Sequence, residues 1–331
     1  MTNGKNSLAK KIPNIVKEIR NNPPPQINFA FQKNISFSQM SIFRSCAYRW
    51  KLQYKDKIKK FNSSIHTVFG TAIHESIQHY LDCAYSKSFA EADRKIDLNE
   101  DFQEKFINEY QKQYRANNNQ HFSSAEEMRE FYEDGIAILS WFKKKRSRYF
   151  SKKRWFLVGC EIPVIVAPNK MLNNILYTGY LDIVLYNEDS DTFKIIDIKT
   201  STKGWNKFDK KNEDKHFQLI LYKKFFSEQY GIPLDNIDIE FFIVKRKVLS
   251  WDDDKIMSPH QAYRVQTFSP PSGKVKLNRA KTAVMDFINS CFNSSGNIKD
   301  IDNPKSPSKW NCTFCPYGDD KELCGAGAHF E

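Results

Sequence analysis

FKIIDIKT, residues 193–200, places an aspartate and a lysine inside a run that otherwise has the composition of a buried strand. Side chains two residues apart in a strand point to the same face of the sheet. Asp197 and Lys199 therefore project together, and Ile196 and Ile198 project to the opposite face. Burying an acid and a base is costly unless they pair with each other or bind a metal. This strand is thus the first place to look for a functional site.

Two more predicted strands precede this one, and each carries an acidic residue. Residues 155–167 contain Glu161, and residues 175–186 contain Asp182. A helix is predicted over 215–230, strands over 237–248 and near 262–268, and a helix near 278–292. In the helix over 215–230, Gln218 and Tyr222 are four residues apart and share a face. The order predicts an α/β core.

The residues before this core predict helices. Asn21-Asn22-Pro23-Pro24-Pro25 should break any helix, so residues 1–34 are expected to be a flexible lead-in. Ser36 and Gln39 fit a capping box at the start of a helix, and further helices are predicted over 67–85 and within 97–150. We divide the rest into a helical portion (35–154), a core (155–300) and a C-terminal cysteine segment (301–331), forming one integrated domain from 35 to 331.

Carboxylates on neighbouring strands can share a hard cation such as Mg²⁺. A bound cation makes a coordinated water more acidic and stabilises charge on a phosphoryl oxygen. A lysine beside it can orient that water or stabilise the developing negative charge. The alternative is a structural ion pair between Asp197 and Lys199 at a strand end. The presence of Asp182 on the second strand, and of Gln218 and Tyr222 on the helix that follows, favours a catalytic site over a structural ion pair.

The order Gly179-x-x-Asp182, Asp197-Ile198-Lys199 and Gln218-x-x-x-Tyr222 resembles the RecB-type nuclease branch of the PD-(D/E)XK superfamily. Upstream, the run Gly70-Thr71-Ala72-Ile73-His74-Glu75 resembles the first motif of that branch, in which the histidine is a metal ligand. The resemblance covers residues from about 36 to 324. It implies a nuclease core in which helices flank a central mixed sheet.

The resemblance also implies metal-dependent hydrolysis of DNA phosphodiesters. Lys199 would position or activate the attacking water, and Gln218 and Tyr222 would line the site. Each role has an ordinary alternative: a surface or core histidine, a solvent-facing strand glutamate, or helix packing. The ligands of Mg²⁺ or Mn²⁺ would be His74, Glu161, Asp182, Asp197 and the backbone carbonyl of Ile198.

Four of the seven cysteines predict a second metal site. Cys312-x-x-Cys315 has metal-ligand spacing and Cys324 follows, which leaves a four-ligand site one short. The run SFSQMSIFRSCAYRWKL (36–52) resembles a helix of AddB-type nucleases and iron–sulfur CRISPR-adaptation nucleases, which carries a lone cysteine. Here that residue is Cys46, and the resemblance implies a [4Fe–4S] cluster on the four thiols. The alternative is a Zn²⁺ ion bound by the same four thiols. The remaining cysteines are expected to be small buried hydrophobes.

The formal net charge of +12 favours a polyanionic partner such as nucleic acid. The densest basic block has aromatic residues among its cations, a pattern typical of binding to a DNA backbone with base stacking. The alternative is a solvated helix end whose aromatics face the core. No base-reading motif is visible, so little sequence specificity is expected. The cations of this basic block are Lys143, Lys144, Lys145, Arg146, Arg148, Lys152, Lys153 and Arg154.

Other classes of protein are disfavoured. No stretch approaches the roughly 18–20 apolar residues of a membrane helix, and no secretory signal is visible, so a cytoplasmic protein is expected. No P-loop motif is present, which favours action alone or beside a separate helicase or single-strand annealing protein. We predict a metal-dependent DNA exonuclease acting at ends in recombination, repair or replication. A phage-encoded enzyme that acts in the host cytoplasm is one form of this expectation. The alternatives are a catalytically inactive DNA-binding protein on the same fold and a restriction-type endonuclease.

Overall fold

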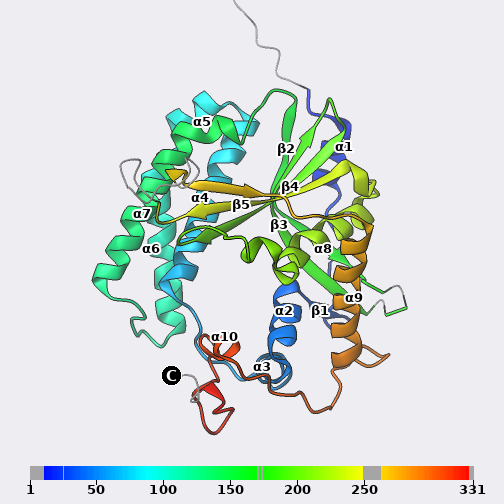
Figure 1. Ribbon diagram of the computed structural model, residues 1–331. Coiled ribbons are helices and arrows are strands. Elements are labelled where there is room, and N and C mark those ends of the chain that lie inside the picture. The colour runs from blue at the N-terminus through cyan, green and yellow to red at the C-terminus, as the bar shows by residue number, and fades with distance from the viewer. Residues whose placement is uncertain (1–10, 25, 170, 173, 249–261, 328–331) are drawn as a thin grey trace, which may run out of the picture.

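Six strands form one mixed sheet at the centre of the described chain (Figure 1). This computed structural model describes residues 11–24, 26–169, 171–172, 174–248 and 262–327. The strand order is β1-β3-β4-β5-β6, and β2 also pairs with β3. β1 is parallel to β3 and β4 to β5, whereas the other pairs are antiparallel. The predicted α/β fold with a central mixed sheet is therefore confirmed. The strands are β1 (Lys33–Ile35), β2 (Trp155–Val166), β3 (Ile175–Asn187), β4 (Thr192–Ser201), β5 (Ile237–Lys245) and β6 (Val265–Phe268).

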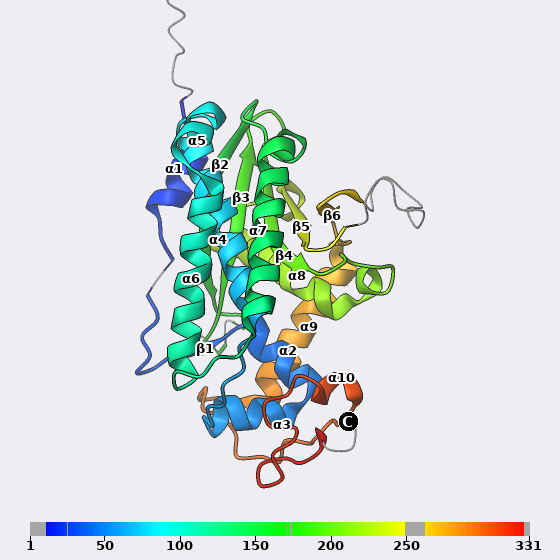
Figure 2. The ribbon, with the colours of Figure 1, turned by 90° about the vertical axis from the view of Figure 1, so that its left-hand side faces the viewer.

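Helices cover both faces of the sheet (Figures 1 and 2). Ile196 and Ile198 belong to the hydrophobic cluster on the α4 side, and Ile195 belongs to the cluster on the α8 side. Asp197 and Lys199 alternate with the first two, so they project towards the α8 side, as the strand pattern predicted. One layer contains α4 (Ile65–Ser86), α5 (Phe89–Lys95), α6 (Leu98–Ala116) and α7 (Ala125–Lys145); the other contains α1 (Asn14–Asn21), α8 (Glu213–Tyr230) and α9 (Lys274–Cys291). None of these helices in the described ranges has both the length and the apolar character needed to cross a membrane.

A smaller group of helices lies below the sheet in Figure 1. It contains α2 (Phe37–Ser45), α3 (Ala47–Trp50), a π-helical turn (Lys51–Lys55) and α10 (Lys309–Cys312). The hydroxyl of Ser36 accepts a hydrogen bond from the backbone N–H of Gln39 at 3.3 Å, which is one half of the predicted capping box. Trp50 is buried between the rings of Phe43 and Phe287. Segments from both ends of the described chain therefore meet here.

Part of the expected lead-in is packed against the sheet. Val16 and Ile19 in α1 are 0% and 5% exposed, because their spacing of three places both on one helical face. Arg20 donates hydrogen bonds to the backbone carbonyls of Leu157 and Val158 in β2. The expectation of a flexible segment therefore does not hold for Asn14–Asn21, which pack before the proline run. Residues 1–10 and 25 lie outside the described residues.

Candidate active site

The candidate site forms where β3 and β4 separate. Their ladder ends at the pair Ile183–Ile196, and the next residues along the two strands are Asp182 and Asp197. The Asp182 carboxylate enters the gap, where its Oδ2 accepts a hydrogen bond from the backbone N–H of Ile198 at 2.7 Å. Because residues opposite each other on paired strands share a face, both carboxylates lie on the same side of the opening.

Lys199 connects these carboxylates to α8. Its Nζ lies 2.9 Å from Oδ2 of Asp197 and donates a hydrogen bond to Oε1 of Gln218 at 2.8 Å. The amide of Gln218 in turn donates to the hydroxyl of Tyr222 at 3.1 Å. Asp197 is 1% exposed, while the Lys199 side chain is 34% exposed. The ammonium therefore lies at the mouth of the site and the carboxylate behind it.

Two glycines of the predicted motifs allow close approaches. A Cβ atom at Gly179 in β3 would lie 2.5 Å from Cε1 of Tyr222, so the ring of Tyr222 occupies that space. A Cβ atom at Gly70 in α4 would lie 3.2 Å from the hydroxyl oxygen of Thr200 in β4. Both glycines thus bring a helix against the strands that carry the acids.

His74 reaches the opening from α4 in the opposite layer. Its Nδ1 lies 3.5 Å from Oδ2 of Asp182. Burial and the positive charge of Lys199 lower the pKa of His74 to about 3, despite a hydrogen bond to the backbone of Ile198 that acts in the other direction. His74 is therefore neutral at physiological pH, so its contact with Asp182 is not an ion pair. A neutral imidazole is the form that ligates metals.

Glu161 completes the acidic side of the opening. The pairs Cys160–Ile183 and Ile162–Leu181 place Glu161 of β2 opposite Asp182 of β3. The backbone of Glu161 is left-handed, with a φ of 51°, a conformation that is uncommon away from glycine and recurs at functional sites.

Sequence reasoning missed Gln78, which also belongs to this opening. Its amide donates to Oε1 of Glu161 at 2.6 Å and to the backbone carbonyl of Asp182 at 3.0 Å. Gln78 follows His74 by four residues in α4, so both lie on one helical face. That spacing is the sequence signal, and it indicates the shared face but not the contact with Glu161.

The electrostatics of the opening favour a bound cation. Burial raises the pKa values of both Asp182 and Asp197, and the Asp197 charge raises that of Asp182 further. Burial alone would lower the pKa of Lys199, but the two aspartates outweigh it and the pKa is raised. One lysine thus faces two carboxylates, of which Asp197 is buried and Asp182 is half-buried. Oδ2 of Asp197 is buried and has no hydrogen bond of acceptable geometry, although the Lys199 ammonium is near.

The donor set fits Mg²⁺ or Mn²⁺. Carboxylate and carbonyl oxygens are the ligands these hard ions prefer. Within the described ranges, no group of three or more His, Cys, Asp or Glu side chains is arranged so that it could hold a metal ion. Mg²⁺ usually keeps several water ligands and needs only one or two carboxylates from the protein, a number that Asp182 and Asp197 would supply.

The four predicted cluster cysteines lie around one cavity. Cys46, Cys312, Cys315 and Cys324 line a space of about 20 Å³ between α3 and the C-terminal segment. Burial raises the pKa of Cys315, and its neighbours Cys324 and Cys46 add to that effect. No three cysteines in the described residues are arranged as a ready metal site.

Hydrogen bonds fix the C-terminal segment against the region around α3. The Asn311 amide donates to the carbonyl of Ser45 at 2.8 Å, across 266 residues of chain. The hydroxyls of Tyr48 and Tyr317 donate to the carbonyls of Leu323 and Ile58. The remaining cysteines, Cys83, Cys160 and Cys291, do not line the cavity.

The basic block of residues 143–154 lies away from the opening. It leads into β2, whose Trp155 pairs with Asn187 at the β3–β4 turn, and β4 then runs seven residues, roughly 23 Å, before it reaches Lys199. Its aromatics face inwards: Phe150 is 2% exposed, and Tyr149 packs on Phe242.

Several cations of this block have protein partners. Arg146 pairs with Asp93 at 2.5 Å, Arg154 pairs with Asp189 at 3.3 Å, and Lys152 donates to the backbone carbonyl of Lys87. Contact between this block and DNA stays a prediction.

Comparison with known proteins agrees with this geometry. The profile of the PD-(D/E)XK nuclease superfamily matches residues 34–324. The matched range includes β3, β4 and α8, which carry the acids, the lysine and its supporting glutamine. The comparison with curated proteins gave no match. Because the match spans most of the chain and the sheet has the expected mixed topology, this protein belongs to the PD-(D/E)XK nuclease superfamily, a family of metal-dependent nucleases.

Proposed function

We propose that this protein is a DNA exonuclease that acts from ends and hydrolyses phosphodiester bonds with Mg²⁺ or Mn²⁺. The observation that carries the proposal is the opening between β3 and β4. There, the buried Asp197 pairs with the ammonium of Lys199, and the half-buried Asp182 lies close enough for the same positive charge to act on it. A purely structural ion pair with Lys199 would need only one carboxylate. The second carboxylate adds a desolvation cost to the folded state, and a bound cation would offset that cost.

In this proposal the metal is held by Asp182 and Asp197, with His74, Glu161 and the carbonyl of Ile198 as further ligands. When bound, such an ion lowers the pKa of a coordinated water and stabilises negative charge on the phosphoryl oxygens. The neutral state of His74 supports its assignment, since a protonated imidazole has no lone pair to offer.

Lys199 acts on the substrate side. Its raised pKa keeps Nζ protonated, so it can orient the attacking water and stabilise the phosphate oxygens as charge accumulates. The water oxygen forms a bond to phosphorus and releases a proton to solvent, the bond from phosphorus to the leaving sugar oxygen breaks, and that oxygen takes up a proton from solvent. Gln218 holds Lys199, and Tyr222 holds Gln218, so these two residues position the lysine.

We further propose that Cys46, Cys312, Cys315 and Cys324 hold a [4Fe–4S] cluster, with Zn²⁺ as the alternative. The support is their shared cavity and the docking of the C-terminal segment on the region around α3. The group would act structurally, by joining segments that are far apart in the chain.

The proposed substrate is DNA with a free end, produced during recombination, repair or replication. A separate helicase or single-strand annealing protein would act beside the nuclease, because the sequence has no P-loop. The basic block of residues 143–154 is proposed to contact the DNA backbone outside the site.

The test compares linear with closed circular DNA in the presence of Mn²⁺, Mg²⁺ or EDTA, using anaerobically purified protein. Loss of linear DNA alone, dependent on metal and absent in Lys199→Ala, supports the proposal. Lys194→Ala is the matched control, because Lys194 lies in the same strand and forms an ion pair of the same length, 2.9 Å, with Glu240. It should leave cleavage intact.

Two results would replace the proposal. Discrete fragments from closed circular DNA would indicate a restriction-type endonuclease. Binding without cleavage of either DNA by the wild type, with both metals, would indicate a DNA-binding protein that uses the nuclease fold without catalysis.

A further inference from the structure

The loop between β4 and α8, residues 202–212, has a composition unlike the rest of the site. It reads TKGWNKFDKKN, with four lysines and a single acidic residue. It leaves β4 two residues after Lys199 and enters α8 five residues before Gln218. The β4–α8 loop therefore joins the two elements that carry the lysine and its positioning glutamine, and it protrudes beside α8 in Figure 2.

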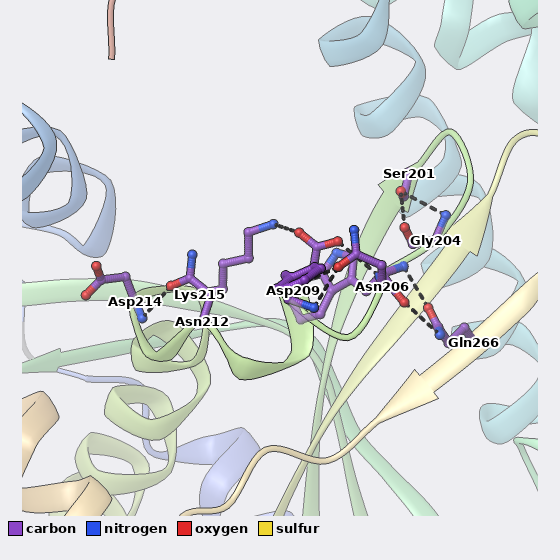
Figure 3. A network of polar contacts seen from close by, with 10 residues as sticks. Ser201, Gly204, Asn206, Asp209, Asn212, Asp214, Lys215 and Gln266 are labelled. Atoms are coloured by element: carbon purple, nitrogen blue, oxygen red, sulfur yellow. Dashed lines mark hydrogen bonds and ion pairs between the residues drawn. The ribbon is translucent and has the colours of Figure 1, made fainter. Parts of the chain in front are cut away.

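The β4–α8 loop is held to the sheet at Trp205. The backbone N–H of Trp205 donates to Oε1 of Gln266 at 2.8 Å, and the Gln266 amide donates back to the carbonyl of Trp205 at 3.1 Å (Figure 3). The Trp205 ring packs on Phe241 in β5, with ring centroids 4.7 Å apart. One of the two aromatic residues of the loop is thus an inward anchor.

A second set of contacts fixes the tip of the loop. Oδ1 of Asn206 accepts hydrogen bonds from the backbone N–H groups of Phe208 and Asp209 at 2.7 and 3.0 Å. The carboxylate of Asp209 pairs with Lys215 in α8 at 2.6 Å (Figure 3). The only acidic side chain of the loop is therefore engaged by a lysine outside it, and the tip is ordered rather than loose.

Phe208 is displayed at this ordered tip. It is 71% exposed, and Nζ of Lys207 lies 5.2 Å from the centre of its ring. Lys203 and Lys211 are also exposed. A single exposed aromatic is ordinary on a protein surface. Phe208 is unusual because its backbone is fixed by Asn206 and because its loop, which follows the strand of Lys199, carries four lysines and one acidic residue.

We propose that Phe208 is a stacking platform for an unpaired base, and that Lys203, Lys207 and Lys211 hold the phosphates next to that base. The occupant is single-stranded DNA, because the charge of the loop complements a phosphate backbone and only an unpaired base offers its face to a ring. A duplex keeps those faces covered by its own stacking. This inference rests on the proposed nuclease function, to which it adds a substrate class: a single-stranded end guided along the β4–α8 loop to Lys199.

The test measures binding in EDTA, so that no cleavage is needed. Phe208→Ala should lower the affinity for a fluorescent oligothymidylate by about 5- to 150-fold, the range expected for losing one base–aromatic stack. Blunt duplex should bind unchanged, and Phe208→Trp should bind single strands as well as the wild type. Phe31→Ala is the matched control, since Phe31 is 78% exposed but is flanked by Ala30 and Gln32 rather than lysines.

A second readout reports stacking directly. An oligonucleotide carrying 2-aminopurine should change in fluorescence on binding the wild type and Phe208→Trp, and should not change with Phe208→Ala. Unchanged single-strand affinity in Phe208→Ala overturns the inference, as does an equal loss for duplex or an undiminished 2-aminopurine signal.

These outcomes are separable from those of the nuclease proposal. If the wild type cuts DNA and Phe208→Ala binds single strands normally, the nuclease proposal stands and the stacking proposal is rejected. If the wild type never cuts DNA but Phe208→Ala abolishes stacking, the nuclease proposal is rejected and the stacking proposal stands.

Discussion

Gly179→Ala tests whether the contact between β3 and α8 positions the site. The added Cβ would lie 2.5 Å from Cε1 of Tyr222 and 3.3 Å from Cδ1 and Cζ. Carbon atoms in contact prefer about 3.5–4.0 Å, so the ring must move by about 1 Å. Gly179 has no positive φ, so alanine fits its backbone and the effect comes from the ring alone.

The cost follows from the burial of Tyr222. The residue is 6% exposed and its hydroxyl accepts from Gln218, so the ring cannot move without disturbing its neighbours. Forcing an extra methyl group into a packed region costs about 1–3 kcal/mol. With an unfolding entropy of about 2.1 cal/mol/K per residue over 331 residues, the melting temperature should fall by about 1.5–4 °C. Because Tyr222 holds Gln218 and Gln218 holds Lys199, cleavage should fall on the order of 100-fold.

The assay is a double-mutant cycle with Tyr222→Leu, measured by urea unfolding. Leucine lacks the Cε1 and Cζ atoms that the new methyl group meets, so Gly179→Ala should cost less than about 0.5 kcal/mol in that background. Gly273→Ala is the control, because no atom lies within 4 Å of the added Cβ. It should change stability by less than about 1 kcal/mol and leave cleavage unchanged. An equal cost for Gly179→Ala in both backgrounds would refute the steric reasoning.

Three further predictions concern charge and metal. Asp182→Asn should raise the melting temperature in EDTA at pH 7, because a raised folded-state pKa means that ionising this carboxyl destabilises the fold. The gain in melting temperature should vanish below about pH 4, where the carboxyl is protonated in both states. A lower melting temperature of the variant at pH 7 would contradict this prediction. His74 has a folded-state pKa of about 3, below its unfolded value near 6.5, so its contribution to stability is complete above pH 6.5 and is lost as the pH falls towards 3. His74→Gln should therefore lose less stability than the wild type between pH 7 and pH 5 in urea titrations, and an equal loss in both proteins would exclude His74 as the cause. Cys46→Ser should lower bound iron or zinc and the melting temperature, whereas Cys291→Ser, buried outside the cavity, should retain the metal by elemental analysis; equal metal content in the two variants would reject the four-cysteine site.

The faces of the strands could be predicted from the sequence, because alternation is a local property. Asp197 and Lys199 project together, and Ile196 and Ile198 pack on the other side, as FKIIDIKT predicts. The separation of β3 from β4 at Asp182 could not be predicted, since the hydrogen bond that fills the gap joins residues 16 apart. Nor does any periodicity indicate the left-handed backbone of Glu161.

Contacts between the layers of the fold also could not be predicted from the sequence. Gln78 reaches β2 and β3 from α4, and its spacing from His74 shows only that the two share a face, not what that face meets. Val16 and Ile19 fall in the segment that the proline run at 23–25 led us to expect as a flexible lead-in. Their burial depends on β2, which is more than 100 residues away in the sequence.

The hydrogen bond between Asn311 and Ser45 sets the order in which the molecule can be completed during synthesis. Ribosomes add about 5–20 residues per second, so the 266 residues between the two partners take roughly 13–50 s to emerge. Through that interval the carbonyl of Ser45 and the cavity side of Cys46 lack their C-terminal partners. Trp50 likewise lacks the rings of Phe287 in α9 and of Phe292, directly after α9, until those residues are made. A chain interrupted before residue 311 would thus carry the candidate catalytic strands without the C-terminal segment that packs on the region around α3. Nascent chains should therefore become protease-resistant around α3 only late in translation.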